Sequence, residues 1–331
     1  MSATIKDVAR EAGVSVATVS RVLNGTDKVT AASTLRVREA VEKLGYSPNF
    51  LGRNLRKRET NVILVIMPSS EHSLYMKICA GMQAFAQTLG YDIITASTND
   101  SGDVESRYLN MLYNRTVDGA VFLGTSLDPE TLNRIALNYD IAVCCEAVVG
   151  ANVLTVNVDD EQAGYDAAKA LIEKGFRRIA FIGAQDSARS SRMRETGFRR
   201  ALEEQGIPLP DDYVYKNSYE IHNGFDAMEK FLSLPEPPEA VFAVSDTLAM
   251  AAMKKAVEHG LTVGKDIAVM GFDNISMCDL MNPPLSTVEQ PCILMGEIVC
   301  KKLIDNMSSD KKDFGIYTVK HRVILRGSTG D

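Results

Sequence analysis

The first 23 residues carry the pattern that most constrains the fold, two short helix signals joined by only three residues. Thr4 and Asp7 form a predicted capping box ahead of apolar residues at helical spacing. Gly13 stands where a helix commonly ends in a left-handed conformation. Ser15 can cap a second helix over residues 16–23. Two helices with so short a connection predict a helix-turn-helix.

A third helix is expected between Thr30 and Gly45, where it would close a three-helix core. In a helix-turn-helix the second helix enters the major groove of DNA, so its outward residues are candidate base contacts. Arg21 can donate two hydrogen bonds to guanine, and the small apolar side chains of this helix can touch thymine methyl groups. The candidate DNA contacts in this region are Thr4, Ser15, Val16, Ala17, Thr18, Ser20, Arg21 and Asn24.

Charge is distributed unevenly along the 331 residues, whose formal net charge is −7. Residues 1–58 hold 11 Lys and Arg against 5 Asp and Glu, a net charge of +6, which leaves −13 for the remainder. A small basic segment on an acidic body indicates that only the basic segment meets a polyanion.

Residues 47–58 form a short basic segment that opens with a helix-start signal, Ser47 followed by Pro48. The segment is too short to be a stable helix by itself, which is typical of a helix that folds on DNA. Leu55 is flanked by arginines and can wedge into the minor groove, kinking the duplex. A plain interdomain linker is the alternative interpretation. The DNA contacts predicted for this segment are Asn49, Arg53 and Leu55.

Residues 60–331 alternate short apolar runs with amphipathic stretches, the pattern of parallel sheets with helices on both faces. The predicted strands are 62–67, 92–96, 119–123, 141–145, 153–158, 178–182, 240–244 and 267–271. The predicted helices include 75–89, 161–174, 193–205 and 247–259. Because the pattern restarts after about Asp159, we expect two similar lobes, with a ligand in the cleft beyond their strand ends.

Several classes of protein are excluded by what the sequence lacks. No apolar run approaches the ~18 residues of a membrane span, and no secretory signal precedes the first helix, so a cytoplasmic protein is expected. The six cysteines show no Cys-x-x-Cys or zinc spacing, which predicts reduced core thiols and no metal. Phosphate-binding glycine loops and nucleophile motifs are missing too, so we expect no cofactor, no catalytic residues and no enzyme activity.

Three segments together resemble the lactose/galactose repressor (LacI/GalR) family of transcription regulators. They read Thr4-Ile5-Lys6-Asp7-Val8-Ala9, then Ala12-Gly13-Val14-Ser15-Val16-Ala17-Thr18-Val19-Ser20-Arg21-Val22-Leu23-Asn24-Gly25, then Tyr46-Ser47-Pro48-Asn49. The resemblance extends more weakly over nearly the whole chain. It implies a repressor that binds a pseudo-palindromic DNA operator as a homodimer, with Leu55 of each hinge helix inserted at a central step that is often CpG.

The resemblance also implies how the chain is divided. We expect an all-α helix-turn-helix headpiece at 1–46, a hinge helix at 47–59, and an effector-binding and dimerisation domain at 60–331. That domain would have the α/β fold of periplasmic binding proteins, with two doubly wound lobes. The N-lobe is expected at about 60–159 and 289–315, and the C-lobe at about 160–288 and 316–331.

Candidate effector contacts follow the predicted strands. They are Ser69 and Tyr75 after the first strand, Arg192 and Arg194 in an arginine-rich loop after the sixth, and Tyr219, Asp246 and Asp273 in the second lobe. By resemblance, Arg194 and Asp273 match ligand-contacting positions, and Tyr219 matches a position that is often aromatic. A guanidinium beside a carboxylate suits adjacent sugar hydroxyls, although the arginines also fit a sugar phosphate. Alternatives are a turn cap for Asp273, a solvated side chain for Arg192 and a core role for Tyr75.

Two other functions remain open at this point. The chain could be a cytosolic solute-binding protein, against which the basic helix-turn-helix argues. It could also be a catabolite-control regulator whose corepressor is a phosphorylated carrier protein, for which the sequence establishes no docking surface.

Overall fold

The computed structural model describes residues 3–23, 29–46, 59–70, 72–99, 101–185 and 189–330. The chain divides into two compact units, Met1–Thr60 and Asn61–Asp331. The first is referred to below as the headpiece and the second as the body. The predicted hinge contacts Asn49, Arg53 and Leu55, together with Asn24, lie outside the described residues.

The headpiece consists of α1 (Ile5–Ala12), α2 (Val16–Leu23) and α3 (Ala31–Lys43). The predicted capping box opens α1, since the backbone N–H of Thr4 donates to the Asp7 carboxylate at 3.0 Å and the Asp7 N–H donates to the Thr4 hydroxyl. Gly13 ends α1 at φ 62°, in the left-handed region. The N–H of Thr18 donates to Ser15 Oγ at 3.1 Å, so Ser15 caps α2. The predicted helix-turn-helix and third helix are therefore confirmed.

The headpiece core is small and takes one face of each helix. Val8, Val19 and Val37 are fully buried there, one from each helix. Burying a valine side chain stabilises a fold by about 1.5–3 kcal/mol, so three such residues matter in a unit of this size. An ion pair between Lys43 and Glu11, at 2.7 Å, also joins α3 to α1 on the surface.

The N-lobe of the body contains a parallel sheet with the strand order β11-β5-β4-β3-β1-β2. Its elements are β1 (Val62–Met67), α5 (Ser73–Thr88), β2 (Asp92–Ser97), α6 (Gly102–Tyr113), β3 (Gly119–Phe122), α7 (Pro129–Ala136), β4 (Asp140–Cys145), β5 (Leu154–Val158), α12 (Cys292–Met307) and β11 (Ile316–Val319). Ile63 of β1 packs with α5 and α12, whereas Leu64 packs with α6 and α7 on the other face. Helices therefore cover both faces of the sheet, as a buried parallel sheet requires.

The C-lobe contains a second sheet with the strand order β12-β10-β9-β8-β6-β7, in which only the β10–β12 pair of the described strands is antiparallel. Its elements are α8 (Asp160–Glu173), β6 (Ile179–Ala184), α9 (Arg189–Glu204), β7 (Val214–Asn217), α10 (Ile221–Leu232), β8 (Ala240–Ala243), α11 (Asp246–Glu258), β9 (Ala268–Asp273), β10 (Ser286–Glu289) and β12 (Arg322–Ile324), with short 3₁₀ turns at Asp211–Tyr213, Ser276–Leu280 and Gly327–Thr329. A cluster of phenylalanines, including Phe181, Phe198 and Phe242, fills the core between this sheet and its helices.

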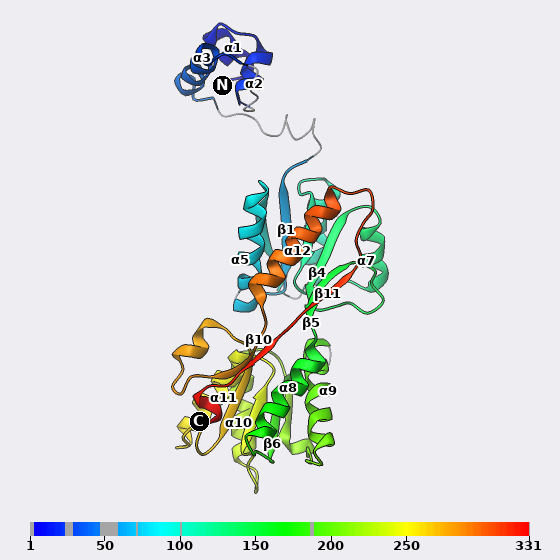
Figure 1. Ribbon diagram of the computed structural model, residues 1–331, viewed down its shortest axis with the longest axis vertical. Coiled ribbons are helices and arrows are strands. Elements are labelled where there is room, and N and C mark those ends of the chain that lie inside the picture. The colour runs from blue at the N-terminus through cyan, green and yellow to red at the C-terminus, as the bar shows by residue number, and fades with distance from the viewer. Residues whose placement is uncertain are drawn as a thin grey trace. The chain divides into compact units, whose positions relative to one another are not determined.

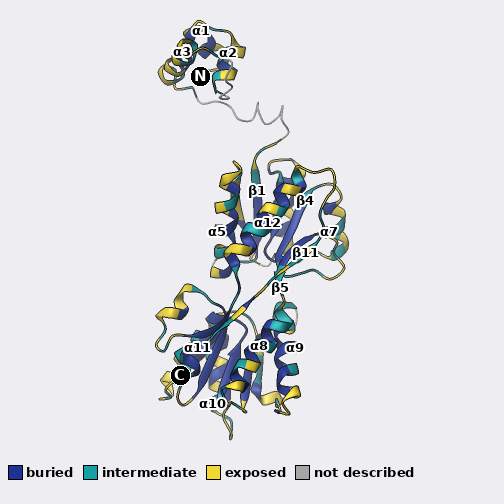
Figure 2. Ribbon diagram, in the orientation of Figure 1, coloured by how far each residue is buried: buried dark blue, intermediate teal, exposed yellow. Residues whose placement is uncertain are grey.

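The chain crosses between the lobes after β5, after β10 and after β11 (Figure 1). The inner strands of both sheets are buried, whereas the edge strands are partly exposed, and the other exposed residues lie mainly on the outer helices and loops (Figure 2). Contacts between strand ends bridge the lobes: for example, the rings of His72, after β1, and Tyr219, after β7, lie 6.3 Å apart. The region where these strand ends of the two lobes meet is referred to below as the interlobe cleft.

The predicted elements of the body are confirmed in type and place. The eight predicted strands overlap β1 to β6, β8 and β9 with ends within two residues, and the four predicted helices overlap α5, α8, α9 and α11. Glycines follow the ends of these helices at positive φ, for example Gly90 at 76° and Gly175 at 96°.

One predicted lobe boundary and one predicted loop are wrong. Residues 316–331 were assigned to the C-lobe, but β11 pairs with β5 in the N-lobe sheet, so the chain changes lobe only after Val319. The residues of this edge strand alternate between exposed and half-buried, so its sequence does not indicate which sheet it joins. The predicted arginine-rich loop is instead the first turns of α9, which begins at Arg189.

Candidate functional site

Arg194 lies at the centre of the C-lobe side of the cleft. Its Nε donates to Asp160 Oδ1 at 2.9 Å and its Nη1 donates to the backbone oxygen of Val244 at 2.7 Å. Its guanidinium stacks on the ring of Phe272, 3.5 Å from the centroid, an arrangement that favours the cation. The side chain is thus held by three elements and keeps a fixed direction.

The ionisation of this pair is set by burial and by neighbouring charges. Burial disfavours the guanidinium, but Asp160, Tyr219 and Asp273 outweigh it and raise the pKa of Arg194. Burial also raises the pKa of Asp160, although Arg194 opposes that shift. Because the guanidinium stays protonated, the positive charge of Arg194 and the negative charge of Asp160 balance each other.

Close packing of α8 on α9 positions the pair. A Cβ on Gly164 would overlap the backbone carbonyl of Arg194, and one on Gly197 would overlap that of Glu161. The two helices can approach this closely only because both positions are glycine. Asp160, at the first residue of α8, consequently meets Arg194 of α9 directly.

Asp273 ends β9 in a strained backbone conformation, at φ 111°. Gln290 donates its side-chain N–H to Asp273 Oδ1 at 2.7 Å, and the hydrogen bonds of the described residues leave Oδ2 as an acceptor. Burial raises the pKa of Asp273, while Arg194 and His72 lower it. Non-glycine residues at positive φ cluster at ligand-binding sites, where the surrounding structure holds the strain.

The N-lobe contributes aromatic rings to the cleft. The imidazole of His72 lies 5.2 Å from the ring of Tyr75 and faces the ring of Tyr219 edge-on at 6.3 Å across the lobes. His72 Nδ1 is buried without a hydrogen-bond partner among the described residues. Burial raises the pKa of Tyr75, and neighbouring acidic groups including Tyr219 and Asp273 add to the shift. These groups meet here because each follows the carboxyl end of a strand or starts the next helix.

Glu146 follows β4 of the N-lobe, and its side chain contacts the start of α9 in the C-lobe. Its Oε1 accepts the backbone N–H of Ser190 at 2.8 Å, and Arg189 Nη1 donates to the oxygen of Ala147 at 2.9 Å. The Ser190 hydroxyl lies 3.3 Å from the hydroxyl of Tyr219. The first turn of α9 therefore contacts both the N-lobe and the aromatic group.

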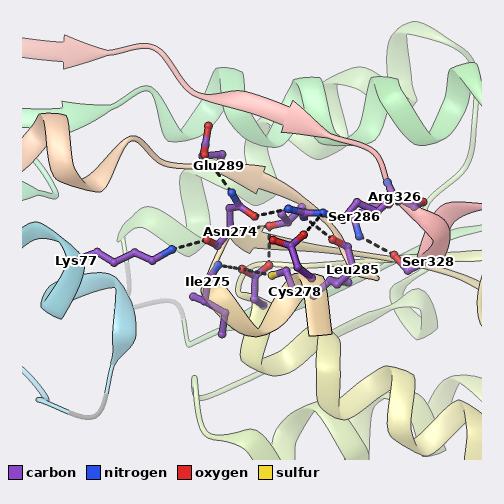
Figure 3. A network of polar contacts seen from close by, with 12 residues as sticks. Lys77, Asn274, Ile275, Cys278, Leu285, Ser286, Glu289, Arg326 and Ser328 are labelled. Atoms are coloured by element: carbon purple, nitrogen blue, oxygen red, sulfur yellow. Dashed lines mark hydrogen bonds and ion pairs between the residues drawn. The ribbon is translucent and has the colours of Figure 1, made fainter. Parts of the chain in front are cut away.

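Asp246, a predicted effector contact, is hydrogen-bonded to Ile275 and Cys278, which are labelled in the polar network of Figure 3. It is fully buried at the start of α11, where Thr287 Oγ1 donates to Oδ1 at 2.6 Å and the N–H of Ile275 donates to Oδ2 at 2.8 Å. Cys278 Sγ also donates to Oδ2, at 3.1 Å. Both carboxylate oxygens are occupied, so Asp246 supports the loop after Asp273.

The same network connects the two lobes through Asn274. Lys77 of α5 donates its ammonium to the Asn274 backbone oxygen at 2.6 Å (Figure 3). The Asn274 side chain donates to Glu289 at 3.0 Å and accepts from Arg326 at 2.9 Å. Because Asn274 directly follows Asp273, this contact between the lobes adjoins the cleft.

Two further predicted contacts belong to the same strand ends and helix starts. Ser69 is half-buried two residues after β1, and Arg192 is exposed on the first turn of α9. Tyr75, Arg194, Tyr219 and Asp273 are the predicted effector residues that the structure gathers around the cleft. Glu146, Asp160 and Gln290 were not predicted, although each follows a strand by one or two residues, the same signal that found Asp273.

The headpiece presents α2 outward. Val16 is 41% exposed, and Ala17 and Arg21 are exposed as well, as a helix that enters the major groove requires. Ser20 and Thr18 are half-buried, and the Thr18 hydroxyl pairs with that of Ser15 at 2.9 Å. Thr4 is exposed but donates its hydroxyl to Asp7 at 2.6 Å.

Both parts of this architecture match families of known proteins. Residues 4–49 match the family described as bacterial regulatory proteins, lacI family, and residues 168–329 match the periplasmic binding protein-like domain. Catabolite control protein A of Priestia megaterium is 33% identical over 331 residues, covering 99% of this chain and 100% of that protein. The chain belongs to the LacI family. The HTH-type transcriptional repressor CytR of Escherichia coli (strain K12) is also 33% identical, covering 99% of this LacI-family chain and 96% of that repressor.

Solved structures agree with this assignment. The structure of the Lac repressor dimer bound to operator and the anti-inducer ONPF matches with a TM-score of 0.89 at 24% identity, over 100% of both chains, which shows the fold. A complex of the transcriptional regulator CelR with cellobiose matches with a TM-score of 0.74 at 28% identity, over 98% of this chain and 99% of that one. As a LacI-family member, the chain is a DNA-binding transcription regulator with a small-molecule effector. None of its described helices is long and apolar enough to cross a membrane.

Proposed function

We propose that this regulator is a repressor that binds a pseudo-palindromic operator as a homodimer and responds to a sugar held in the interlobe cleft. The observation that carries the proposal is the presence, in one chain, of a helix-turn-helix with an exposed α2 and a cleft lined by Arg194 and Asp273. The match of residues 4–49 to the lacI family supports DNA binding over the alternative of a solute-binding protein.

The DNA contacts proposed for α2 follow from its exposed face. Arg21 donates to guanine, and Val16 and Ala17 touch thymine methyl groups. Ser15, Thr18, Ser20 and Thr4 supply short hydroxyl side chains for phosphates and base edges. Asn24 and the hinge residues Asn49, Arg53 and Leu55 complete the contacts, with Leu55 as the minor-groove wedge.

The effector would act by changing how the lobes close. Ligand groups that bridge Asp273 and Arg194 to His72 and Tyr75 join the C-lobe to the N-lobe, so binding favours one relative arrangement of the lobes. Lys77 and Asn274 connect the same lobes beside the cleft. Operator and effector must then change each other's affinity by the same factor, typically worth about 1–3 kcal/mol.

We further propose that the chain has no enzymatic activity and acts in the cytoplasm, where a regulator of this family meets chromosomal DNA. The polar groups of the cleft are engaged in fixed pairs, such as Arg194 with Asp160 and Asp273 with Gln290, which suits binding of an unaltered ligand.

Arg21→Ala tests the DNA-reading role. The substitution should weaken binding to the preferred duplex by about 1–3 kcal/mol and leave binding to random DNA nearly unchanged, measured by fluorescence anisotropy. Arg38→Ala is the matched control, since Arg38 is exposed on α3 outside the reading helix. Equal losses on both duplexes for Arg21→Ala would refute the base-reading role.

A further inference from the structure

The first described turn of α9 accepts a carboxylate from the opposite lobe. The unpaired N–H groups and the dipole at a helix start attract negative charge, which is why phosphates commonly bind there. In this protein Glu146, from the opposite lobe, already accepts the N–H of Ser190 at 2.8 Å. Asp160, Arg194 and Arg189 are its charged neighbours, so the carboxylate lies inside the cleft and not on the outer surface.

Each arginine of the cleft already donates some of its N–H groups to the protein. Arg194 is bonded to Asp160 and to the Val244 oxygen, and Arg189 donates to the Ala147 oxygen. Among the described residues, the charged side chains nearest to Glu146 and Asp273 are those of Asp160, Arg194 and Arg189. Three carboxylates therefore face two guanidiniums inside the cleft, and the ammonium of Lys77 lies beside it on the Asn274 oxygen. A phosphate monoester entering the cleft would add up to two negative charges to a site that already has an excess of acid.

The unused polar atoms suit a different kind of ligand. The hydrogen bonds of the described residues occupy one oxygen of Glu146 and one of Asp273, which leaves the other oxygen of each as an acceptor. His72 Nδ1 is buried without a partner in the described part of the chain. A neutral compound with several hydroxyl groups can donate to these acceptors, and the rings of Tyr75 and Tyr219 can cover its apolar face.

We propose that Glu146 is a specificity-determining residue that occupies the phosphate position at the start of α9, so that the effector is an unphosphorylated sugar and sugar phosphates are rejected. The inference rests on the proposed function, because it concerns the ligand of the same cleft. It goes further by assigning selection against anions to one side chain.

Inorganic phosphate provides a direct test on the full chain. Isothermal titration at constant ionic strength should show no binding to the wild type and millimolar binding to Glu146→Ala, which uncovers the Ser190 N–H. Glu146→Gln should bind phosphate more weakly than Glu146→Ala, because the amide oxygen still fills the position. Glu130→Gln, an exposed carboxylate of α7, is the control and should behave as the wild type does. Phosphate binding by the wild type, or none by Glu146→Ala, would overturn the proposal.

Matched pairs of sugars extend the test to organic ligands. Glucose, fructose and ribose are compared with their phosphate monoesters by thermal shift and by operator binding. The phosphate ester should bind at least ~10-fold more weakly than its parent sugar in the wild type, and the difference should shrink in Glu146→Gln, because one facing negative charge is removed. A phosphate ester that stabilises the wild type more than its parent sugar contradicts the proposal. Failure of the proposed function is a separate result, namely no preference for any palindromic duplex by the wild type.

Discussion

The two lobes contribute to the cleft in different ways. On the C-lobe side, Arg194 and Asp160 hold each other, and Gln290 holds Asp273. On the N-lobe side, His72 has a buried ring nitrogen without a hydrogen-bond partner among the described residues. The C-lobe half is therefore built before a ligand arrives, whereas the N-lobe half is completed by one. Substitutions in the C-lobe should cost folding stability as well as binding, and those in the N-lobe should cost binding alone.

The largest effect is expected from Arg194→Met. The change leaves the carboxylate of Asp160 buried without its cation, so the free energy of unfolding should fall by about 3–5 kcal/mol. Urea unfolding measures this change. Arg134→Met, at an exposed arginine of α7, should change the free energy by no more than about 0.5 kcal/mol. If Arg194→Met unfolds as the wild type does, the C-lobe half is not held together by this pair.

Asp246 should make the stability of the C-lobe depend on pH. Burial, with Asp273 adding to it, raises the pKa of Asp246 from 3.8 to about 7. Between these two pH values the folded chain binds a proton that the unfolded chain has lost. The free energy of unfolding therefore falls as pH rises from about 3.8 to about 7 and is constant above that range. The drop is about 2–4 kcal/mol, shared with Asp273 because the two carboxyls titrate together.

Asp246→Asn isolates that contribution, because the amide cannot titrate. Urea unfolding at each pH measures the stability of both proteins. As pH rises from 4 to 7, the free energy of unfolding of the wild type should fall relative to that of the variant. A difference that is independent of pH would show that Asp246 is ionised throughout this range in the folded chain.

His72→Phe tests the N-lobe half of the comparison. The phenyl ring keeps the contact with Tyr75 but removes the unpartnered nitrogen, so sugar binding should weaken by about 1–2 kcal/mol while urea unfolding stays unchanged. His222→Phe, at an exposed position of α10, is the control for adding an aromatic ring. A loss of folding stability without a loss of sugar binding would make His72 a packing residue and not a ligand contact.

The smallest effect is expected from Lys77→Met, which removes the ammonium that donates to the Asn274 oxygen between the lobes. The coupling free energy between sugar and operator, obtained from the ratio of operator affinities with and without sugar, should change by about 0.5–1 kcal/mol. Only the balance between the two lobe arrangements is affected. Lys169→Met, an exposed lysine of α8, should leave that ratio unchanged. An unaltered ratio in Lys77→Met would remove this contact from the coupling between the sites.

Local signals were sufficient to predict the headpiece and the strands of the body. Thr4, Gly13 and Ser15 act within a few residues of their own positions, and the apolar runs of the sheets are continuous. The lobe of β11 was not predictable in this way, because a short edge strand joins whichever sheet the chain reaches. Its placement depends on contacts far apart in the sequence.

The cleft was predicted only in part, for a related reason. Arg194 and Asp273 were found through family resemblance and position after strands, but their partners Asp160 and Gln290 lie 34 and 17 residues away. Asp246 also stands at a strand end and was predicted as a contact, yet its oxygens are satisfied by Thr287 and Ile275. Sequence position gives the edge of the sheet at which a side chain lies. It does not show whether neighbouring residues already form hydrogen bonds with all of its polar atoms.

Operator binding by the full chain tests the central claim most directly. Duplexes selected from a random library should share a pseudo-palindrome, bound at least ~10³-fold more tightly than unselected DNA. Adding the sugar that most raises the thermal stability of the chain should change that affinity by ~5–150-fold. Equal affinity for selected and random duplexes, unchanged by every sugar tested, would contradict the account.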